Sequence, residues 1–184
     1  MSREDEYQLV ETCRHLSRIG MMPASDGNCS IRIGESKALI TPTGTRKEQL
    51  KPQDLVQIDL EADENVEKAS SEWRMHAALL RANSEINAVV HAHPTYLSAA
   101  GVSGEAPDAD LLFETRDNVG EIVLIPAAEP GSQEYADLVV SKMGNATVGI
   151  LSKHGAVAVG STIEEAQFRL ERAEHLAHIV LVSR

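Results

Sequence analysis

Residues 87–93 place the strongest constraint on how this chain can fold. An apolar segment with high β-strand propensity ends there in His91 and His93, and alternate residues of a strand lie on the same face. Both imidazole rings therefore face the same side at the end of a strand. Two neutral imidazoles that converge in this way suit a borderline metal ion such as zinc, which needs one or two further ligands from elsewhere in the chain.

Two other residues have the chemistry to complete such a site. Glu72 precedes an apolar segment with helical periodicity, and His154 lies in a turn-forming segment between two apolar runs. A pair of histidines two positions apart is, on its own, more often half-buried or exposed than bound to metal. The pair becomes informative through its position at a strand end and through these additional candidates.

The size and charge of the chain limit its class. Its 184 residues are sufficient for one domain with a substantial core, and we expect a single domain over residues 1–184. The formal net charge of −11 argues against a nucleic-acid partner and against binding to an anionic membrane surface. A small phosphorylated substrate is still compatible with this charge, because backbone amides and one local cation can bind a phosphate in an acidic protein.

Cysteine content and the N-terminal segment bear on the compartment. Cys13 and Cys29 are the only cysteines, too few for a disulfide framework. The first residues are acidic and lack an apolar signal core, and no apolar run approaches membrane-spanning length. We therefore expect a cytoplasmic protein.

Apolar periodicity predicts alternating helices and strands. Helices are expected over residues 3–19, 47–50, 70–82, 94–100, 131–143 and 161–182, and strands over residues 29–33, 38–41, 55–59, 87–93, 122–125, 147–151 and 156–159. The inner face of the first helix should include Tyr7 and Ile19, and that of the last helix Phe168. Several consecutive strands are joined by short turns, so we predict an α/β fold with a mixed sheet and helices on both faces.

The connections at the predicted strand ends bear on the site. Residues 152–155 join the last two predicted strands, which places His154 on a tight turn at an edge of the sheet. Gly101 is expected to end the helix that follows His93. A second histidine pair, His175 and His178, lies three positions apart on the last helix, where such pairs are far more often structural than metal-binding.

Two polar turns and one helix start could form a small anion pocket. The turns at residues 25–28 and 42–45 each adjoin the end of a predicted strand, although such turns are also typical of simple hairpin connections. Ser70 and Ser71 precede Glu72 at an expected helix start, where one serine is sufficient to cap the helix. A second serine beside the positive end of the helix dipole also fits an anion site.

Five short motifs together resemble a known family. The motifs GN (27–28), ITPTG (40–44), SSEW (70–73), HAHP (91–94) and HG (154–155) occur in the order and approximate spacing of the zinc-dependent class II aldolase/adducin family. The similarity runs from the first expected helix through the last and is greatest to the sugar-phosphate aldolases of that family. The resemblance implies a three-layer α/β/α sandwich around a mixed, largely antiparallel sheet, assembled as a homotetramer with active sites at subunit interfaces.

The resemblance also implies the roles of individual residues. His91, His93 and His154 would bind one Zn²⁺ per subunit, and Glu72 would be the catalytic acid/base and a possible fourth metal ligand. The substrate phosphate would be bound by Asn28, Thr43, Gly44, Ser70 and Ser71. Three neutral imidazoles leave the zinc ion doubly positive, so it can polarise a ketone carbonyl and stabilise the enediolate that forms when a carbon–carbon bond breaks. The neighbouring carboxylate can then transfer protons.

The implied reaction cleaves a phosphorylated ketose, of the L-fuculose 1-phosphate type, to dihydroxyacetone phosphate and an aldehyde. The sequence departs from the family at one proton donor. Related aldolases use a tyrosine that a neighbouring subunit supplies from the loop after the second histidine, whereas residues 111–114 read LLFE here. Relatives often carry another tyrosine in a tail after the last helix, and the present sequence ends at Arg184. Zinc binding and enediolate formation are therefore better supported than the identity of the aldehyde.

Other functions are open within the family and outside it. Ribulose-phosphate 4-epimerases carry Asp in place of Glu72, methylthioribulose-phosphate dehydratases carry Thr in place of Trp73, and an adducin-like binding module does not need a complete ligand set. A metallo-β-lactamase needs an acidic residue and another histidine soon after His93, and a cupin needs a glutamate closer than Glu105. A Schiff-base aldolase needs a lysine in an apolar strand, which this chain lacks.

Overall fold

Seven strands form one mixed sheet. The structure is a computed structural model that describes residues 3–62 and 66–183, with Arg3 described in its backbone only. In these ranges the sheet order is β3-β2-β1-β4-β7-β6-β5, in which β5 and β6 are parallel and every other neighbouring pair is antiparallel. The strands are β1 (Asn28–Arg32), β2 (Lys37–Ile40), β3 (Val56–Asp59), β4 (Ala88–Ala92), β5 (Ile122–Ile125), β6 (Val148–Leu151) and β7 (Gly155–Gly160).

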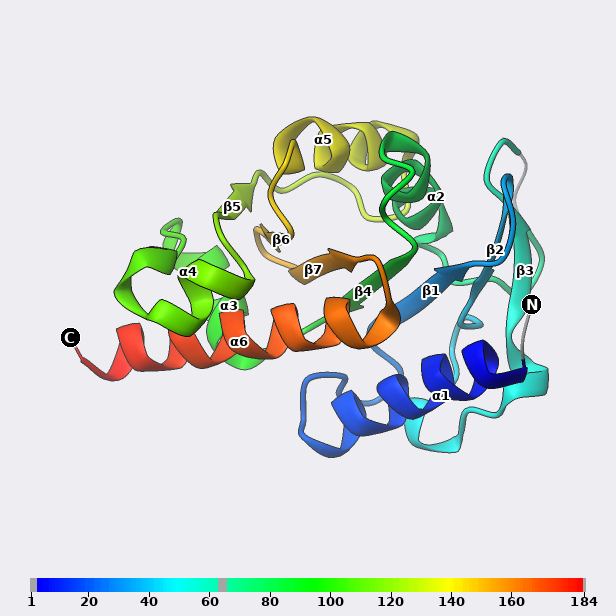
Figure 1. The fold of residues 1–184 in the computed structure, drawn as a ribbon, viewed down its shortest axis with the longest axis horizontal. Helices are drawn as coiled ribbons and strands as arrows, with labels where there is room; N and C mark the ends of the chain where they lie inside the picture. The colour runs from blue at the N-terminus through cyan, green and yellow to red at the C-terminus, as the bar shows by residue number, and fades with distance from the viewer. Residues whose placement is uncertain (1–2, 63–65, 184) are drawn as a thin grey trace.

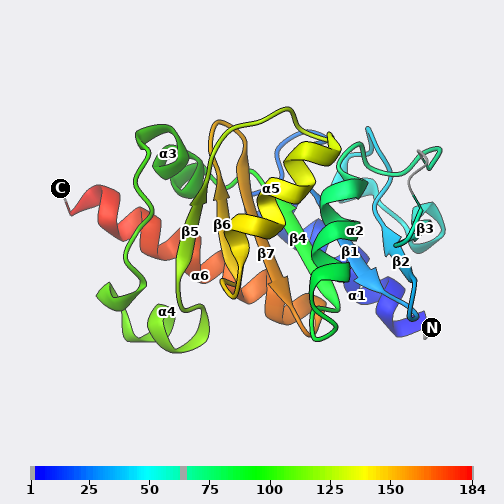
Figure 2. The same cartoon turned by 90° about the horizontal axis from the view of Figure 1, so that it is seen from above.

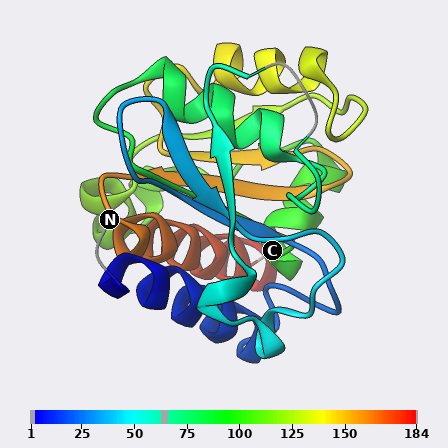
Figure 3. The same cartoon turned by 90° about the vertical axis from the view of Figure 1, so that its right-hand side faces the viewer.

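Helices cover both faces of this sheet and give a three-layer sandwich. The helices are α1 (Arg3–Arg18), α2 (Trp73–Ala82), α3 (Thr95–Ser103), α4 (Phe113–Asn118), α5 (Gln133–Met143) and α6 (Ile163–Val182), with 3-10 turns η1 (Lys47–Gln49), η2 (Pro52–Asp54) and η3 (Ala109–Leu111). Helices α2 and α5 lie on one face, and α1 and α6 lie on the other (Figure 1 and Figure 3). Helices α3 and α4 lie near the C-terminal end of α6 (Figure 2). The predicted α/β/α architecture is confirmed.

The core consists of two apolar clusters, one on each side of the sheet. One cluster includes Leu9 from α1 and Leu170 from α6, and the other includes Met75 from α2 and Val139 from α5. Strand β4 lies between them and is buried along its whole length, as expected for a continuous apolar run in the middle of a covered sheet. It pairs with β1 and β7, so the end of β4 is held from both sides.

Two of the differences from the predicted helix boundaries concern α2 and α3, the helices that follow the serine pair and His93. Helix α2 begins at Trp73 rather than Ser70; Glu72 is its N-cap residue, and no side chain caps it. The serine cap was therefore wrong, and Ser70 Oγ instead accepts a hydrogen bond of 3.3 Å from the backbone N–H of Glu72. Helix α3 continues past Gly101 and ends at Ser103, with Gly104 (φ 79°) as its C-cap residue. A Cβ at Gly101 would lie 3.0 Å from Ile150, so this glycine allows close packing against β6 rather than ending the helix.

The sequence did not predict helix α4, and it misplaced three side chains. Only six residues long, α4 carries no clear apolar period. Tyr7, Ile19 and Phe168 were expected to face inward, but they are 58%, 47% and 51% exposed. Helical periodicity gives the direction of the buried face but not its width, so residues at the margin of the face are assigned less well.

The turn that carries His154 also lies elsewhere than predicted. Strands β6 and β7 are interior strands, whereas the outer strand on that side of the sheet is β5. His154 is therefore at the end of two central strands and not at a lateral edge of the sheet. This position brings it next to the end of β4.

Candidate active site

Three histidines from two neighbouring strand ends form one cluster. His91 is in β4, His93 follows that strand, and His154 lies in the turn between β6 and β7. Their ring centroids are 5.0 Å (His91–His93), 4.7 Å (His91–His154) and 4.9 Å (His93–His154) apart. One ligand nitrogen from each lies within 4.8 Å of the others, and within the described ranges no other group of His, Cys, Asp or Glu has this spacing.

Glycine at position 155 makes this approach possible. A Cβ there would lie 2.8 Å from His93 Cδ2 and even closer to the carbonyl oxygen of Ala92. Antiparallel pairing of β4 with β7 places His91 opposite Val157 and Ala92 opposite Ala156, which fixes the hairpin beside the end of β4. The sheet register and one glycine therefore bring together ligands that are about sixty residues apart in the chain.

Glu72 approaches the histidine cluster from the start of α2. Its Oε2 lies 3.1 Å from His91 Nε2 and its Oε1 lies 3.7 Å from His154 Nδ1, and only 6% of the residue is exposed. Burial alone would raise the pKa of Glu72, but His91, His154 and the hydrogen bond from Asn28 together hold this pKa well below its ordinary value. The carboxylate is therefore ionised at neutral pH.

The pKa values of the three histidines shift in different directions because their surroundings differ. Burial lowers the pKa of His91, but the Glu72 carboxylate and the carbonyl of Ala156, which accepts a hydrogen bond of 2.9 Å from His91 Nδ1, outweigh it and raise that pKa above its usual value. Burial and the neighbouring His91 lower the pKa of His93, and the same two effects lower that of His154 to about 4. His93 and His154 are thus neutral at pH 7, which is the form that binds metal.

The donor atoms of this cluster fit a divalent metal ion. Glu72 Oε1 and His154 Nδ1 are buried and have no hydrogen-bond partner among the described residues, although they face each other. The Nε2 atoms of His91 and His93 also face each other at 3.2 Å. A cation bound between these lone pairs would satisfy them together. Three imidazoles and one carboxylate are a common ligand set for zinc and for related transition metals.

A buried hydrogen-bonded chain fixes the carboxylate from behind. Ser30 Oγ contacts His76 Nδ1 at 2.7 Å, His76 Nε2 contacts Asn28 Oδ1 at 2.5 Å, and Asn28 Nδ2 donates to Glu72 Oε2 at 2.9 Å. Burial lowers the pKa of His76 to about 3, so its ring is neutral. The Nε2–H must then donate to the Asn28 oxygen, which turns the amide nitrogen toward Glu72.

His76 was not predicted to be part of the site. It lies four positions after Glu72 on α2, so the two side chains share a helix face, and this spacing was the available signal. Nothing in the sequence indicated its hydrogen-bond partner on β1. Asn28 was predicted to bind phosphate; its side-chain amide is hydrogen-bonded to His76 and Glu72, and its role toward phosphate stays a prediction.

One cavity of about 310 Å³ joins the histidine cluster to the predicted anion pocket. Three of the predicted metal-site residues line it, namely Glu72, His93 and His154. All five residues predicted to contact phosphate also line it: Asn28, Thr43, Gly44, Ser70 and Ser71. The structure therefore brings the two polar turns and the segment before α2 to the metal-binding group. Asp26 and Lys47, which were not predicted to belong to the site, also line this cavity.

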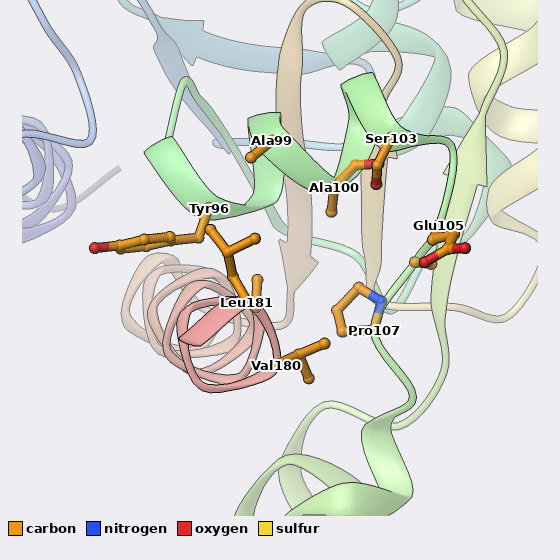
Figure 4. Close-up of a pocket in the computed structure, with 10 residues that line it drawn as sticks. Tyr96, Ala99, Ala100, Ser103, Glu105, Pro107, Val180 and Leu181 are labelled. Carbon is orange, nitrogen blue, oxygen red and sulfur yellow. The ribbon is translucent and has the colours of Figure 1, made fainter. Parts of the chain in front are cut away.

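A second cavity, of about 80 Å³, lies between α3 and the end of α6 and has a different character. Figure 4 shows mostly aliphatic side chains around it, among them Ala100, Val180 and Leu181, with Ser103 and Glu105 at one side. None of the three histidines lines this cavity. It lacks the convergent polar groups of a catalytic site, so the polar cavity at the end of β4 is the candidate active site.

Residues 111–114, which read LLFE, lie outside this cavity. Leu111 and Phe113 are 60% and 71% exposed, and no residue of 111–114 lines the cavity. Tyr135 on α5 is buried, with its ring centroid 6.4 Å from that of His154, but it does not line the cavity either. Among the described residues of the chain, no tyrosine lines the active-site cavity.

Comparison with known proteins identifies the family. The sequence profile of the Class II Aldolase and Adducin N-terminal domain matches residues 7–181. The chain belongs to this family. An L-fuculose phosphate aldolase of Escherichia coli (strain K12) is 30% identical over 177 residues, which cover 96% of this chain and 82% of that relative. A 3-oxo-tetronate 4-phosphate decarboxylase of Haemophilus influenzae is 28% identical over 93% of this chain and 84% of its own length.

A solved structure agrees with the fold of this class II aldolase. The crystal structure of an L-fuculose-1-phosphate aldolase from Thermus thermophilus has a TM-score of 0.88 and 28% sequence identity, and covers 100% of this chain and 96% of its own. The chain is therefore a lyase of the class II aldolase type, with a three-histidine group suited to the metal on which this class depends. In the described part of the chain, no helix is long and apolar enough to cross a membrane.

Proposed function

We propose that this class II aldolase cleaves a ketose 1-phosphate, of the L-fuculose 1-phosphate type, to dihydroxyacetone phosphate and an aldehyde. The proposal depends on one observation: two of the three clustered histidines, His93 and His154, border the same 310 Å³ cavity as the Glu72 carboxylate and the two polar turns. The metal-binding group at one end of the cavity suits the ketone of such a substrate. The anion pocket at the other end suits its phosphate, which is only a few bonds away from the ketone.

His91, His93 and His154 would bind one Zn²⁺ per subunit, with Glu72 as a fourth ligand when no substrate is bound. When bound, the ion would polarise the ketone carbonyl and stabilise the enediolate left by carbon–carbon cleavage. The ring nitrogen of His91 that is not used for the ion donates to the Ala156 carbonyl at 2.9 Å, and a hydrogen bond of this kind orients a metal-binding imidazole.

Glu72 would act as the acid/base residue. Because the Glu72 carboxylate is ionised before the reaction, any proton that it later delivers must first be taken from the substrate. The source would be the hydroxyl group on the carbon that becomes the aldehyde. That proton would be returned to the carbon from which the aldehyde departs, so no proton is gained or lost overall. The hydrogen bond from Asn28 keeps Oε2 in place during this exchange.

The phosphate would bind where the five predicted residues meet, namely Asn28, Thr43, Gly44, Ser70 and Ser71. Thr43 and Ser71 supply hydroxyl donors on exposed parts of the cavity wall, and Gly44 has a φ of 68°, which a side chain would disfavour. Ser70 is buried and positions the Glu72 amide through the bond between them. These groups would bind phosphate without an exposed basic patch, in keeping with the −11 net charge.

The experiment combines metal analysis of the purified protein with a screen of ketose 1-phosphates. We expect about one zinc ion per chain and release of dihydroxyacetone phosphate from ketose 1-phosphates, with no release of dihydroxyacetone from the unphosphorylated ketoses. Glu72→Gln should retain the metal and lose about 10²- to 10⁴-fold in kcat, the usual contribution of a general acid/base. A metal-loaded enzyme that cleaves no ketose phosphate, or a Glu72→Gln variant with normal turnover, would contradict the proposal.

Decarboxylation of a 3-oxo acid phosphate is the second candidate. It is favoured by the Haemophilus influenzae relative, which is named for that reaction and matches over nearly the same share of this chain. Loss of CO₂ from a 3-oxo acid leaves an enolate, and aldol cleavage leaves an enediolate. The same metal-binding group would therefore suit either reaction. Measuring CO₂ together with dihydroxyacetone phosphate in the same screen distinguishes the two, as do parallel assays for sugar-phosphate epimerase and dehydratase activity.

We also propose that residues 1–184 form one domain that assembles as a homotetramer. The continuous seven-stranded sheet supports a single domain. Support for assembly comes from five exposed apolar residues on α3, η3, α4 and the end of α6, a region seen at one end of the molecule in Figure 1: Val102, Leu111, Phe113, Leu181 and Val182. Exposed apolar residues concentrated at one end of a molecule are typical of a surface that another protein chain covers.

A further inference from the structure

Lys47 is a buried cation in the wall of the active-site cavity. It begins η1 and is 1% exposed, and it is the one lysine or arginine in the described ranges whose side chain is buried. It lines the cavity together with Thr43, Gly44 and Ser71. A lysine is almost never fully buried without a compensating charge, so its position calls for an explanation.

The contacts of Lys47 connect the two polar turns. Its Nζ donates to the carbonyl oxygen of Ser25 at 2.8 Å and to that of Thr45 at 3.0 Å. Ser25 belongs to the turn before β1, and Thr45 belongs to the turn after β2. The ammonium group therefore holds together the two segments that supply most of the anion pocket, and a third N–H donor has no partner among the recorded hydrogen bonds of the described chain.

The charge of Lys47 is not neutralised by a close carboxylate. No Asp or Glu oxygen of the described residues lies within ion-pair distance of its Nζ, and Asp26 acts on it only from farther away. Burial lowers the pKa of Lys47, while Cys13, Cys29 and Asp26 oppose this effect. Carbonyl oxygens can solvate an ammonium ion, but they leave its net charge in place.

A purely structural clamp does not explain this arrangement. Neutral donors can bridge two carbonyl oxygens without the cost of burying a charge. A cation is favoured at this place if an anion occupies the adjacent cavity during the catalytic cycle. The other groups in the predicted phosphate pocket, the hydroxyls of Thr43 and Ser71 and the backbone at Gly44, carry no formal charge.

We propose that Lys47 is a positioning residue for the substrate phosphate. Its positive charge, in the cavity wall, balances the charge of the phosphate. Its hydrogen bonds hold the turns at residues 25–28 and 43–45 in the conformation that binds phosphate. This inference rests on the proposed function, because it assigns a cation to the phosphate end of the same cavity. It also explains how a chain with a net charge of −11 binds a dianion: the cation is local and shielded from bulk solvent.

The test compares three variants of the metal-loaded full-length enzyme. Lys47→Met removes the charge and keeps the length of the side chain, and Lys47→Arg keeps the charge. Lys51→Met is the control, because it makes the same substitution at an exposed lysine four residues later. Calorimetry with inorganic phosphate should show binding weakened by about tenfold or more in Lys47→Met, as for loss of a charge-assisted contact, partial recovery in Lys47→Arg, and no change in Lys51→Met. The metal content should stay constant throughout.

Kinetics and NMR separate a charge effect from a packing effect. With a phosphorylated ketose, Lys47→Met should raise KM by about the same factor as it weakens phosphate binding, with a smaller change in kcat. If Lys47→Met does not fold, wild-type protein labelled with ¹⁵N-lysine serves instead, because the buried Lys47 ammonium resonance should shift when phosphate is added. Unchanged phosphate affinity in a folded Lys47→Met variant, or an ammonium resonance that does not respond, would overturn the inference.

The result is distinguishable from failure of the proposed reaction. If wild-type enzyme binds phosphate through Lys47 but releases no dihydroxyacetone phosphate from any ketose phosphate, the aldolase proposal fails and the role of Lys47 stands. If ketose phosphates are cleaved and Lys47→Met binds phosphate normally, the reaction stands and Lys47 is a structural clamp only.

Discussion

At the scale of single residues, the side chains around Glu72 are fixed before any substrate enters. Ser30, His76 and Asn28 form a buried chain that ends on Glu72 Oε2. Each member has its donor and acceptor matched to the next, so the chain admits one orientation of the Asn28 amide. The carboxylate therefore does not have to reorganise when it receives or returns a proton, which is an advantage for catalysis.

Asp26 should strengthen metal binding through His93. Its Oδ2 lies 3.3 Å from His93 Nδ1, and a carboxylate on the outer nitrogen of a metal-binding imidazole orients the ring and increases its basicity. We expect Asp26→Asn to weaken zinc binding by about 10- to 100-fold, measured by competition with a chromophoric chelator. Asp110→Asn, at an exposed carboxylate outside the site, should have no effect. Equal zinc affinity in Asp26→Asn and wild type would show that this contact is incidental.

His76 should make the metal-free protein sensitive to acid. Its pKa is lowered from 6.5 to about 3 by burial, so below pH 6.5 the unfolded chain takes up a proton that the folded chain does not. The free energy of unfolding therefore decreases as the pH falls, by about 2 kcal/mol between pH 7.5 and pH 5 for one such group. Urea unfolding of His76→Gln should show a smaller loss, because glutamine carries no proton in either state.

The control for this pH effect is His175→Gln, which alters an exposed histidine on α6. It should retain the pH dependence of the wild type. If His76→Gln and wild type lose the same stability between the two pH values, the acid sensitivity arises from other groups, such as His93 and His154, whose pKa values are also lowered.

At the scale of secondary structure elements, the strand ends that carry the ligands were predictable and the contacts between elements were not. The period-two pattern before His91 and His93 predicted their shared face, because that pattern depends only on neighbours in the sequence. The roles of His76, Asp26 and Lys47 depend on partners in other elements. Their contacts follow from the register of β1 with β4 and from the packing of α2, which no local pattern contains.

The closeness of β7 to the end of β4 should depend on Gly155. Gly155→Ala would place a Cβ within 2.8 Å of His93 Cδ2, so the hairpin must move away or the strand pairing must break. We expect a loss of about 1–3 kcal/mol in the free energy of unfolding, typical of overpacking, together with weaker metal binding. Denaturant unfolding and zinc competition measure the two effects.

Gly34→Ala is the matched control for this change. A Cβ at Gly34 meets no atom within 4 Å, and this glycine is not among those with a positive φ. It should therefore leave both stability and zinc affinity within experimental error of the wild type. If Gly34→Ala and Gly155→Ala change stability and zinc affinity equally, steric crowding at the hairpin does not explain the effect of Gly155→Ala.

At the scale of the whole molecule, the exposed apolar residues at one end are the feature that a single chain does not explain. Phe113 is 71% exposed, so its replacement does not disturb the core. If this end forms the contact between subunits, Phe113→Asp should shift the molar mass in light scattering from about 80 kDa, four times 19.9 kDa, toward that of one chain. Tyr7→Asp, at a 58% exposed aromatic residue on α1, is the control and should leave the mass unchanged.

The arrangement of the ligands on the sheet has one further consequence. Two histidines adjoin the end of β4 and the third lies in a hairpin paired with that strand, so the backbone hydrogen bonds of one sheet position all three. Extraction by a chelator should then be reversible, without refolding. Cobalt(II), which accepts the same ligands as zinc and absorbs visible light, could be exchanged into the protein as a coloured reporter of events around the ion.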